Sequence, residues 1–144
     1  MISRRVSAAA GLVLLCIGSM MAAASAQSAR PTLIYACDEQ SEPCKVWHSQ
    51  WQPMFAASAA AKLVDMRTIT APTAKALMMP AAWPADLRWV LDTFLMSQVG
   101  RWDEYETPRF FLLQNGKITA STGGNNGWRD FMWPTLVDIT NTKP

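Results

Sequence analysis

The feature that most constrains this chain is a short acidic segment with a cysteine at each end, Cys37 and Cys44. Before it, residues 31–36 (PTLIYA) form a short apolar run that is typical of a buried strand. After it, apolar residues recur at a helical period, which predicts a helix from about Glu42 to about Phe55. We therefore expect one sulfur atom at the end of a strand and the other at the start of a helix.

Local signals support a helix that begins between the cysteines. Ser41 is a residue type that caps helices, because its hydroxyl accepts a backbone N–H of the first turn. Pro43 suits that turn, where its missing N–H would have no partner anyway. We therefore expect Cys44 near the helix N-terminus, where unpaired N–H groups and the helix dipole favour a thiolate. The acidic side chains between the cysteines act against that thiolate.

A secretory signal peptide is predicted for residues 1–26. The segment has two arginines near its start, then an apolar run too short for a membrane span, then a small-x-small site that ends at Ala26. Cleavage is expected after Ala26, which leaves one domain over residues 27–144. We expect this domain to be periplasmic or secreted, with no stable membrane span after cleavage.

The composition of the mature part narrows the classes of partner. The chain has 13 basic and 11 acidic residues, and two of the basic ones leave with the signal peptide. The mature part therefore has nearly equal numbers of basic and acidic residues, and this gives no argument for nucleic acid as a partner. Cys16 also leaves, so Cys37 and Cys44 are an isolated pair in an oxidising compartment, for which a Cys37–Cys44 disulfide is expected.

The order of the remaining elements predicts the fold class. After the first strand and helix we expect a strand at 62–69, an irregular connection at 70–84, a helix from Pro84, a hairpin of strands at 110–113 and 117–121, and a last helix at 128–139. The glycine-rich residues 123–127 are expected to form a turn. The first two strands flank a helix and should be parallel, so an α/β fold with a mixed four-stranded sheet follows.

Two stretches resemble the thioredoxin-like fold superfamily. Pro43-Cys44-Lys45 is similar to the end of its Cys-Gly-Pro-Cys-Lys motif, and Thr107-Pro108 with the following hairpin resembles its cis-proline strand. The resemblance covers nearly all of the mature chain. It implies a four-stranded mixed sheet flanked by helices, with an enlarged helical insertion at roughly 70–100 before the cis-proline strand. It also implies that Thr107 and Pro108 shape a groove for a substrate peptide.

The chain departs from the family at the position of the nucleophilic cysteine, which is Ser41 here. A Cys-x6-Cys pair, Cys37 and Cys44, stands in place of Cys-x-x-Cys. The leading hypothesis is thiol–disulfide exchange on envelope or secreted proteins, with Cys37 as the more exposed sulfur and Cys44 as the resolving one. The enzyme class implied is thiol–disulfide oxidoreductase, with catalytic candidates Cys37, Cys44, Pro108 and Thr107 and no cofactor.

Two other interpretations stay open. In the first, the disulfide is a static clip, which stabilises a domain this small by about 2–3 kcal/mol. The protein is then a redox-silent module that helps to assemble an envelope or secretion complex through the tryptophans and methionines of its insertion. In the second, Cys37, Cys44 and His48 are weak candidates for a copper or zinc site, because two thiolates and an imidazole suit these metals.

Overall fold

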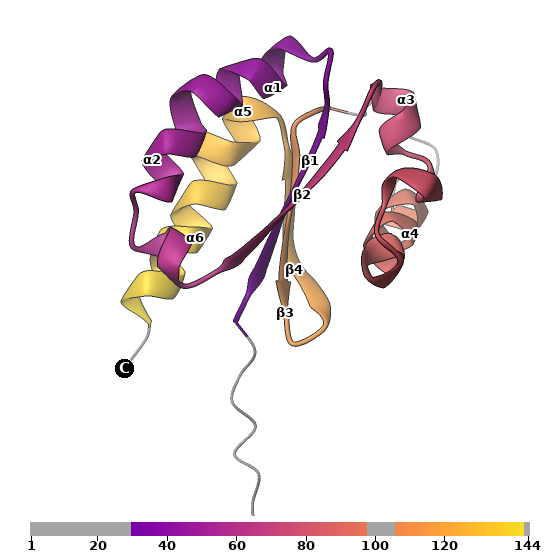
Figure 1. Ribbon diagram of the computed structural model, residues 1–144. Helices are drawn as coiled ribbons and strands as arrows, with labels where there is room; N and C mark the ends of the chain where they lie inside the picture. The colour runs from indigo at the N-terminus through magenta and orange to yellow at the C-terminus, as the bar shows by residue number, and fades with distance from the viewer. Residues whose placement is uncertain (1–29, 98–105, 143–144) are drawn as a thin grey trace, which may run out of the picture.

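The computed structural model describes residues 30–97 and 106–142, which form one mixed sheet with helices on both faces (Figure 1). The four strands lie in the order β2-β1-β3-β4. Their bounds are β1 Thr32–Asp38, β2 Asp65–Ala71, β3 Arg109–Gln114 and β4 Lys117–Gly123. The predicted signal peptide, residues 1–26, lies outside the described residues. The described residues contain no helix that is long and apolar enough to cross a membrane.

The strand directions match those predicted. Strand β1 is parallel to β2, with Cys37 opposite Thr70, and antiparallel to β3, with Tyr35 opposite Phe110. Strands β3 and β4 are an antiparallel hairpin, and their turn has positive φ at Asn115 and Gly116 (51° and 72°). This is the two-residue turn that matches the twist of a hairpin. The sheet order and directions, with helices on both faces, are those of a thioredoxin-like α/β fold.

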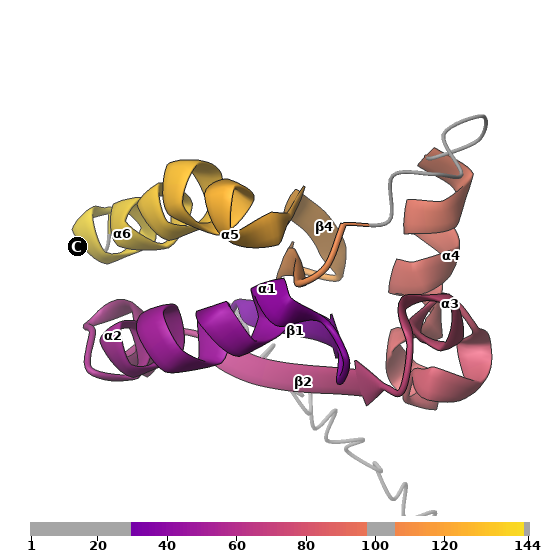
Figure 2. The ribbon, with the colours of Figure 1, turned by 90° about the horizontal axis from the view of Figure 1, so that it is seen from above.

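Helices form a layer on each face of the sheet (Figures 1 and 2). One layer holds the helical stretch that follows β1 and the C-terminal helical stretch. Its elements are α1 Glu42–Val46, η1 Trp47–Trp51, α2 Gln52–Ala56, α5 Gly124–Gly127, η5 Trp128–Met132 and α6 Trp133–Asn141. The other layer contains α3 Ala74–Leu77 and α4 Arg88–Ser97, with short 3-10 turns η3 Pro80–Ala82 and η4 Ala85–Leu87 between them. A further 3-10 turn, η2 Ala60–Lys62, leads into β2.

Successive side chains of the central strand β1 point to opposite faces of the sheet, so the core has two parts. Tyr35 and Cys37 face the first layer, where Trp47 and Trp128 pack against them. Ile34 and Ala36 of β1 face the second layer, with the apolar stripe that runs from η4 into α4. That stripe was predicted from a helical period, and its buried members are Leu87, Val90, Leu91 and Phe94. The cysteines therefore belong to the layer that carries α1.

Several sequence expectations differ from the structure, among them the irregular connection predicted at 70–84, which contains α3 and η3. Strand β1 continues past residue 36 to Asp38, because pairing with β2 extends to Ala71. Strand β2 starts at Asp65 rather than at residue 62, after the turn η2. Residues 124–127, predicted as a plain turn, form the short helix α5, with a left-handed φ of 69° at Gly124.

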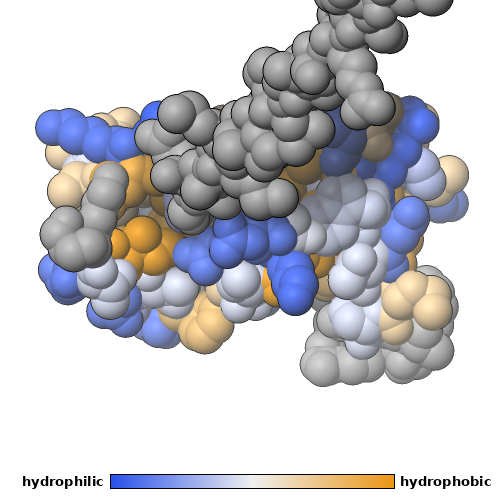
Figure 3. Space-filling model, turned by 90° about the horizontal axis from the view of Figure 1, so that it is seen from below, coloured by the Kyte–Doolittle hydropathy of each residue, from blue (hydrophilic) through white to orange (hydrophobic). Residues whose placement is uncertain are grey.

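The visible part of the end of the molecule opposite the α1 N-terminus shows no broad apolar area. In Figure 3 the coloured part of this face is mostly hydrophilic, and its hydrophobic atoms lie in small separate areas. The larger exposed apolar side chains of α3–α4 and its connections are Met79, Trp89 and Met96. Scattered apolar side chains of this kind are common on soluble domains.

Candidate redox site

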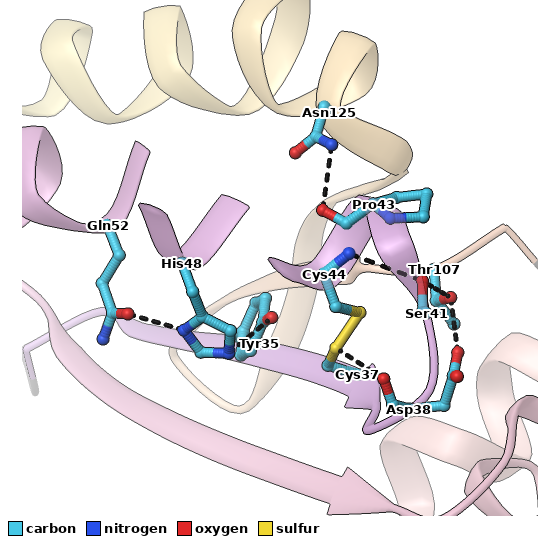
Figure 4. Close-up of a disulfide and its surroundings, with 10 residues drawn as sticks. All are labelled: Tyr35, Cys37, Asp38, Ser41, Pro43, Cys44, His48, Gln52, Thr107 and Asn125. Atoms are coloured by element: carbon cyan, nitrogen blue, oxygen red, sulfur yellow. Dashed lines mark hydrogen bonds between the residues drawn. A yellow bond between two sulfur atoms is a disulfide. The ribbon is translucent and has the colours of Figure 1, made fainter. Parts of the chain in front are cut away.

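A disulfide joins the end of β1 to the first turn of α1 (Figure 4). Cys37 is the last residue but one of β1, and Cys44 is the third residue of α1. Their Cα atoms are 6.1 Å apart. The backbone N–H of Cys44 points to the hydroxyl oxygen of Ser41, 3.4 Å away, so Ser41 caps the helix as predicted. The expected pairing of Cys37 with Cys44 is confirmed.

Both cysteines are buried, and Cys37, which was expected to be the more exposed sulfur, differs little from Cys44. Cys37 is 3% exposed and Cys44 is 2% exposed. The reason is the length of β1: the strand runs on to Asp38, so Cys37 points from the sheet into the core rather than from a loop into solvent. A nucleophile therefore has no direct approach to either sulfur unless the flanking turn moves.

A chain of hydroxyls and one carboxylate lies beside the disulfide (Figure 4). The Thr107 hydroxyl donates to Asp38 Oδ2 at 2.7 Å and lies 3.1 Å from Ser41 Oγ. Because Thr107 has one hydroxyl proton, Ser41 donates to Thr107 while its own oxygen accepts the helix N–H. Asp38 and Thr107 are 6% and 8% exposed. This chain joins the end of β1, the cap of α1 and the segment before β3.

The segment before β3 is held between α1 and α5. The Thr107–Pro108 peptide bond is cis, and Pro108 is buried. The carbonyl of Pro108 accepts the backbone N–H of Gly124 at 2.7 Å. The Asn125 side chain donates to the carbonyl of Pro43 at 3.0 Å, so α5 also contacts the start of α1. Thr107 therefore lies against Asp38 and Ser41, which flank the cysteine pair, and Pro108 joins this segment to α5.

Tyr35 and His48 form a second polar contact under the same helix. Tyr35 is fully buried, and its hydroxyl lies 3.1 Å from His48 Nε2. His48 is exposed, and its Nδ1 lies 2.6 Å from the amide oxygen of Gln52. The ring of Tyr35 stacks on Trp47 with centroids 4.3 Å apart. Burial, with a smaller contribution from the charge of Asp38, raises the pKa of Tyr35 well above its ordinary value.

The three weak metal candidates do not form a ligand set in the described structure. Cys37 and Cys44 share a disulfide, and both ring nitrogens of His48 have partners. Residues 30–97 and 106–142 hold no group of three or more His, Cys, Asp or Glu side chains arranged for a metal ion.

Sequence reasoning found the cysteines, the cap and the proline segment, but it missed two interactions. It did not pair Asp38 with Thr107, because these residues are far apart in the chain. It also gave Tyr35 no partner. The available signal was spacing, since Tyr35 lies two residues before Cys37 on a strand and His48 lies four residues after Cys44 on a helix.

Comparisons with known proteins add little beyond the fold. No protein-family model matches the sequence, and no curated protein matches it significantly. One similar solved structure is a thioredoxin from Malassezia sympodialis, described as a member of a pan-allergen family. It is 13% identical over 76% of this chain and 74% of that chain, with a TM-score of 0.45. The fold assignment therefore rests on the strand order and directions described above.

Proposed function

We propose that the protein carries out thiol–disulfide exchange on envelope or secreted proteins through Cys37 and Cys44. The observation that carries this proposal is the position of the disulfide, between a strand end and a helix N-terminus and near Thr107, whose hydroxyl contacts Asp38 and Ser41. A helix N-terminus stabilises a thiolate by its unpaired N–H groups and its dipole. Cys44, in the first turn of α1, is therefore suited to be the sulfur that leaves when the disulfide is attacked.

In this proposal each residue has a defined role. A substrate thiolate attacks the Sγ atom of Cys37, a mixed disulfide forms, and the bonding electrons pass to Cys44. A second substrate thiol then attacks the mixed disulfide and releases Cys37, so the substrate becomes a disulfide and the protein a dithiol. Thr107 and Pro108, which the family resemblance assigns to a substrate groove, would guide the substrate to the pair. The flanking turn at Glu39 and Gln40, which is exposed, has to move for the attack.

A second candidate is favoured by the burial of both cysteines. In that candidate the disulfide is a static clip between β1 and α1, and the domain acts as a redox-silent assembly module. Its contact surface would include the exposed side chains Met79, Trp89 and Met96, at 54%, 37% and 74% exposure. Trp83, which lies in the connection predicted at 70–84, is core: it is 2% exposed and donates to the carbonyl of Leu77 at 2.8 Å.

The reduction potential of the disulfide separates the two candidates. Purified protein is equilibrated in graded thiol–disulfide buffers, free thiols are alkylated, and the mass shift is read. A potential within the range of catalytic exchange proteins, about −120 to −270 mV, supports exchange. A disulfide that stays closed in all of these buffers overturns the exchange proposal and leaves the assembly module. A Cys37→Ser variant, which has one thiol, calibrates the mass shift.

A further inference from the structure

A groove lies between helix α4 and the β3–β4 hairpin, on the face of the sheet opposite the disulfide. Its volume is about 260 Å³. The side chains that line it are Thr93, Phe94 and Ser97 of α4 and Phe111, Ile118 and Ser121 of the hairpin. Phe94 and Phe111 are buried, with ring centroids 5.6 Å apart and one ring edge towards the other. The floor of the groove is therefore apolar.

Arg109 lies beside this groove. It is the first residue of β3, two residues before Phe111 and on the same face of the sheet. The central carbon of its guanidinium group lies 4.4 Å from the centroid of the Phe94 ring, which also lines the groove. On β4, Gly123 is opposite Arg109. Ser121, which lines the groove, is opposite Phe111. The cation and the groove therefore adjoin, with Phe94 common to both.

Two contacts hold the guanidinium group in place. The first is the ring of Phe94, whose negative face attracts a cation. The second is the backbone at Gly123, where a side-chain carbon would lie 2.8 Å from Arg109 Nη2. The guanidinium group thus occupies space that the glycine leaves free. A ligand meets a cation that is already positioned, which lowers the entropy cost of binding.

The guanidinium group has no acceptor among the described residues. No hydrogen bond or ion pair joins it to residues 30–97 or 106–142, and its Nε is shielded from solvent without a partner. Burial lowers the pKa of Arg109, and the charge of Glu106 acts against this shift without forming an ion pair. A carboxylate would supply the missing acceptor, because it accepts two parallel N–H bonds from a guanidinium group.

The polar side chains of the groove place the donors for an anion on the hairpin side. The hydroxyls on the α4 rim donate to carbonyls of their own helix, Thr93 at 2.7 Å and Ser97 at 2.6 Å. Ser121 is exposed, and its hydroxyl can donate to a ligand. An anionic group in the groove is therefore bound at the end that carries Ser121 and Arg109.

We propose that this groove binds a small apolar carboxylic acid, with its tail on the rings of Phe94 and Phe111 and its carboxylate on Arg109. A cavity of about 150 Å³ holds benzene, so this groove has room for one ring and a short chain. Along β4 the step from Ser121 to Gly123 is about 6.6 Å. A chain of two or three carbons therefore carries a carboxylate from the floor of the groove to the guanidinium group.

The test is a titration of the purified, ¹⁵N-labelled protein with 3-phenylpropionate at pH 7, followed by amide chemical shifts in NMR spectra. The matched ligand is 3-phenylpropanamide, which has the same shape and no charge. Arg109→Gln removes the cation and keeps a hydrogen-bonding group. Arg67→Gln is the matched control, because it removes the same charge from an exposed arginine of β2, at the other edge of the sheet.

We expect the acid to bind wild type at least tenfold more tightly than the amide, within the range that hydrogen bonds to charged groups contribute. The shifts should centre on Phe111, Ile118 and Ser121. Arg109→Gln should bind the two ligands equally, and Arg67→Gln should keep the wild-type ratio. Ser121→Phe, which fills the groove from its exposed rim, should weaken both ligands at least tenfold.

Equal affinities of acid and amide in wild type overturn the inference, and this comparison does not depend on the folding of any variant. Shifts centred outside the groove overturn it too, as does a preference for the acid that survives in Arg109→Gln. Tighter binding of the peptide acetyl-Gly-Gly-Phe than of the free acid assigns the groove to a chain end and overturns the assignment to a small acid. None of these outcomes depends on disulfide exchange, because the groove shares no residue with the cysteine site.

Discussion

The substitution Thr107→Val tests whether the hydroxyl chain beside the disulfide holds the site together. Valine has nearly the shape of threonine, so the change removes the hydroxyl and leaves the volume. The Thr107 hydroxyl is the donor that the structure shows for the carboxylate of Asp38, which is 6% exposed. The hydroxyl also links Ser41, the cap of α1, to that carboxylate.

The expected loss of stability follows from the negative charge of the acceptor, the carboxylate of Asp38. Hydrogen bonds to charged groups contribute about 1.5–3 kcal/mol, and a buried acceptor that loses its donor also keeps its desolvation cost. We therefore expect Thr107→Val to lower the free energy of unfolding by about 2–3 kcal/mol. Asp38→Asn removes the charge, so in that background the same substitution should cost less, and the double-mutant cycle should show a coupling of at least about 1 kcal/mol.

The assay is equilibrium unfolding in urea, followed by the fluorescence of the buried Trp47 and Trp128 with the disulfide intact. Thr70→Val is the matched control, because Thr70 is an exposed strand residue whose substitution should stay within about 0.5 kcal/mol. Non-reducing mass measurement checks that every variant keeps the disulfide. A cost for Thr107→Val no larger than that of Thr70→Val refutes the reasoning.

Three further predictions concern other parts of the site. Ser41→Cys places a thiol at the helix cap, three residues before Cys44, where the helix N-terminus stabilises a thiolate. The rate of insulin reduction should rise at least tenfold over wild type, and an unchanged rate would contradict this stabilisation. Burial raises the pKa of Tyr35, and unfolded tyrosine ionises near pH 10, so wild type should lose stability above that pH by up to about 1.4 kcal/mol per pH unit. Urea unfolding at pH 9 to 11 should show a smaller loss in Tyr35→Phe. Gly124→Ala and Gly116→Ala should each lower stability in thermal unfolding by about 1 kcal/mol or more, because both glycines have positive φ (69° and 72°). The two costs should be similar, because the new methyl at Gly124 meets only the flexible side chain of Glu106.

Most of the fold could be predicted from local patterns. The apolar stripe of α4, the Asn115-Gly116 turn and the Ser41 cap each combine a residue type with a spacing that has a single structural meaning. The parallel direction of β1 and β2 was predicted because a helix lies between them in the chain. These signals lie within a few residues of one another, so they need no knowledge of tertiary contacts.

The sequence predictions were wrong where tertiary contacts determine the structure. Nothing local shows that β1 continues to Asp38, because its last residues are held by pairing with β2. Trp83 lies between prolines and has the sequence context of a loop, yet its ring packs 6.0 Å from Phe111 of β3. The contact of Asp38 with Thr107 also joins two segments that a sequence window cannot see together.

The extension of β1 by two residues changes the chemistry that the site can perform. If the strand ended at residue 36, Cys37 would lie in a loop and its sulfur would meet substrates directly. Because the strand continues, the sulfur points into the core, and the half-buried cap position of α1 is held by Ser41, a hydroxyl. A hydroxyl there can cap the helix and bind Thr107, but it cannot exchange disulfides. Exchange therefore requires the turn after β1 to open, so substitutions that loosen Ser41 from Thr107 should speed reduction of the disulfide even as they lower stability.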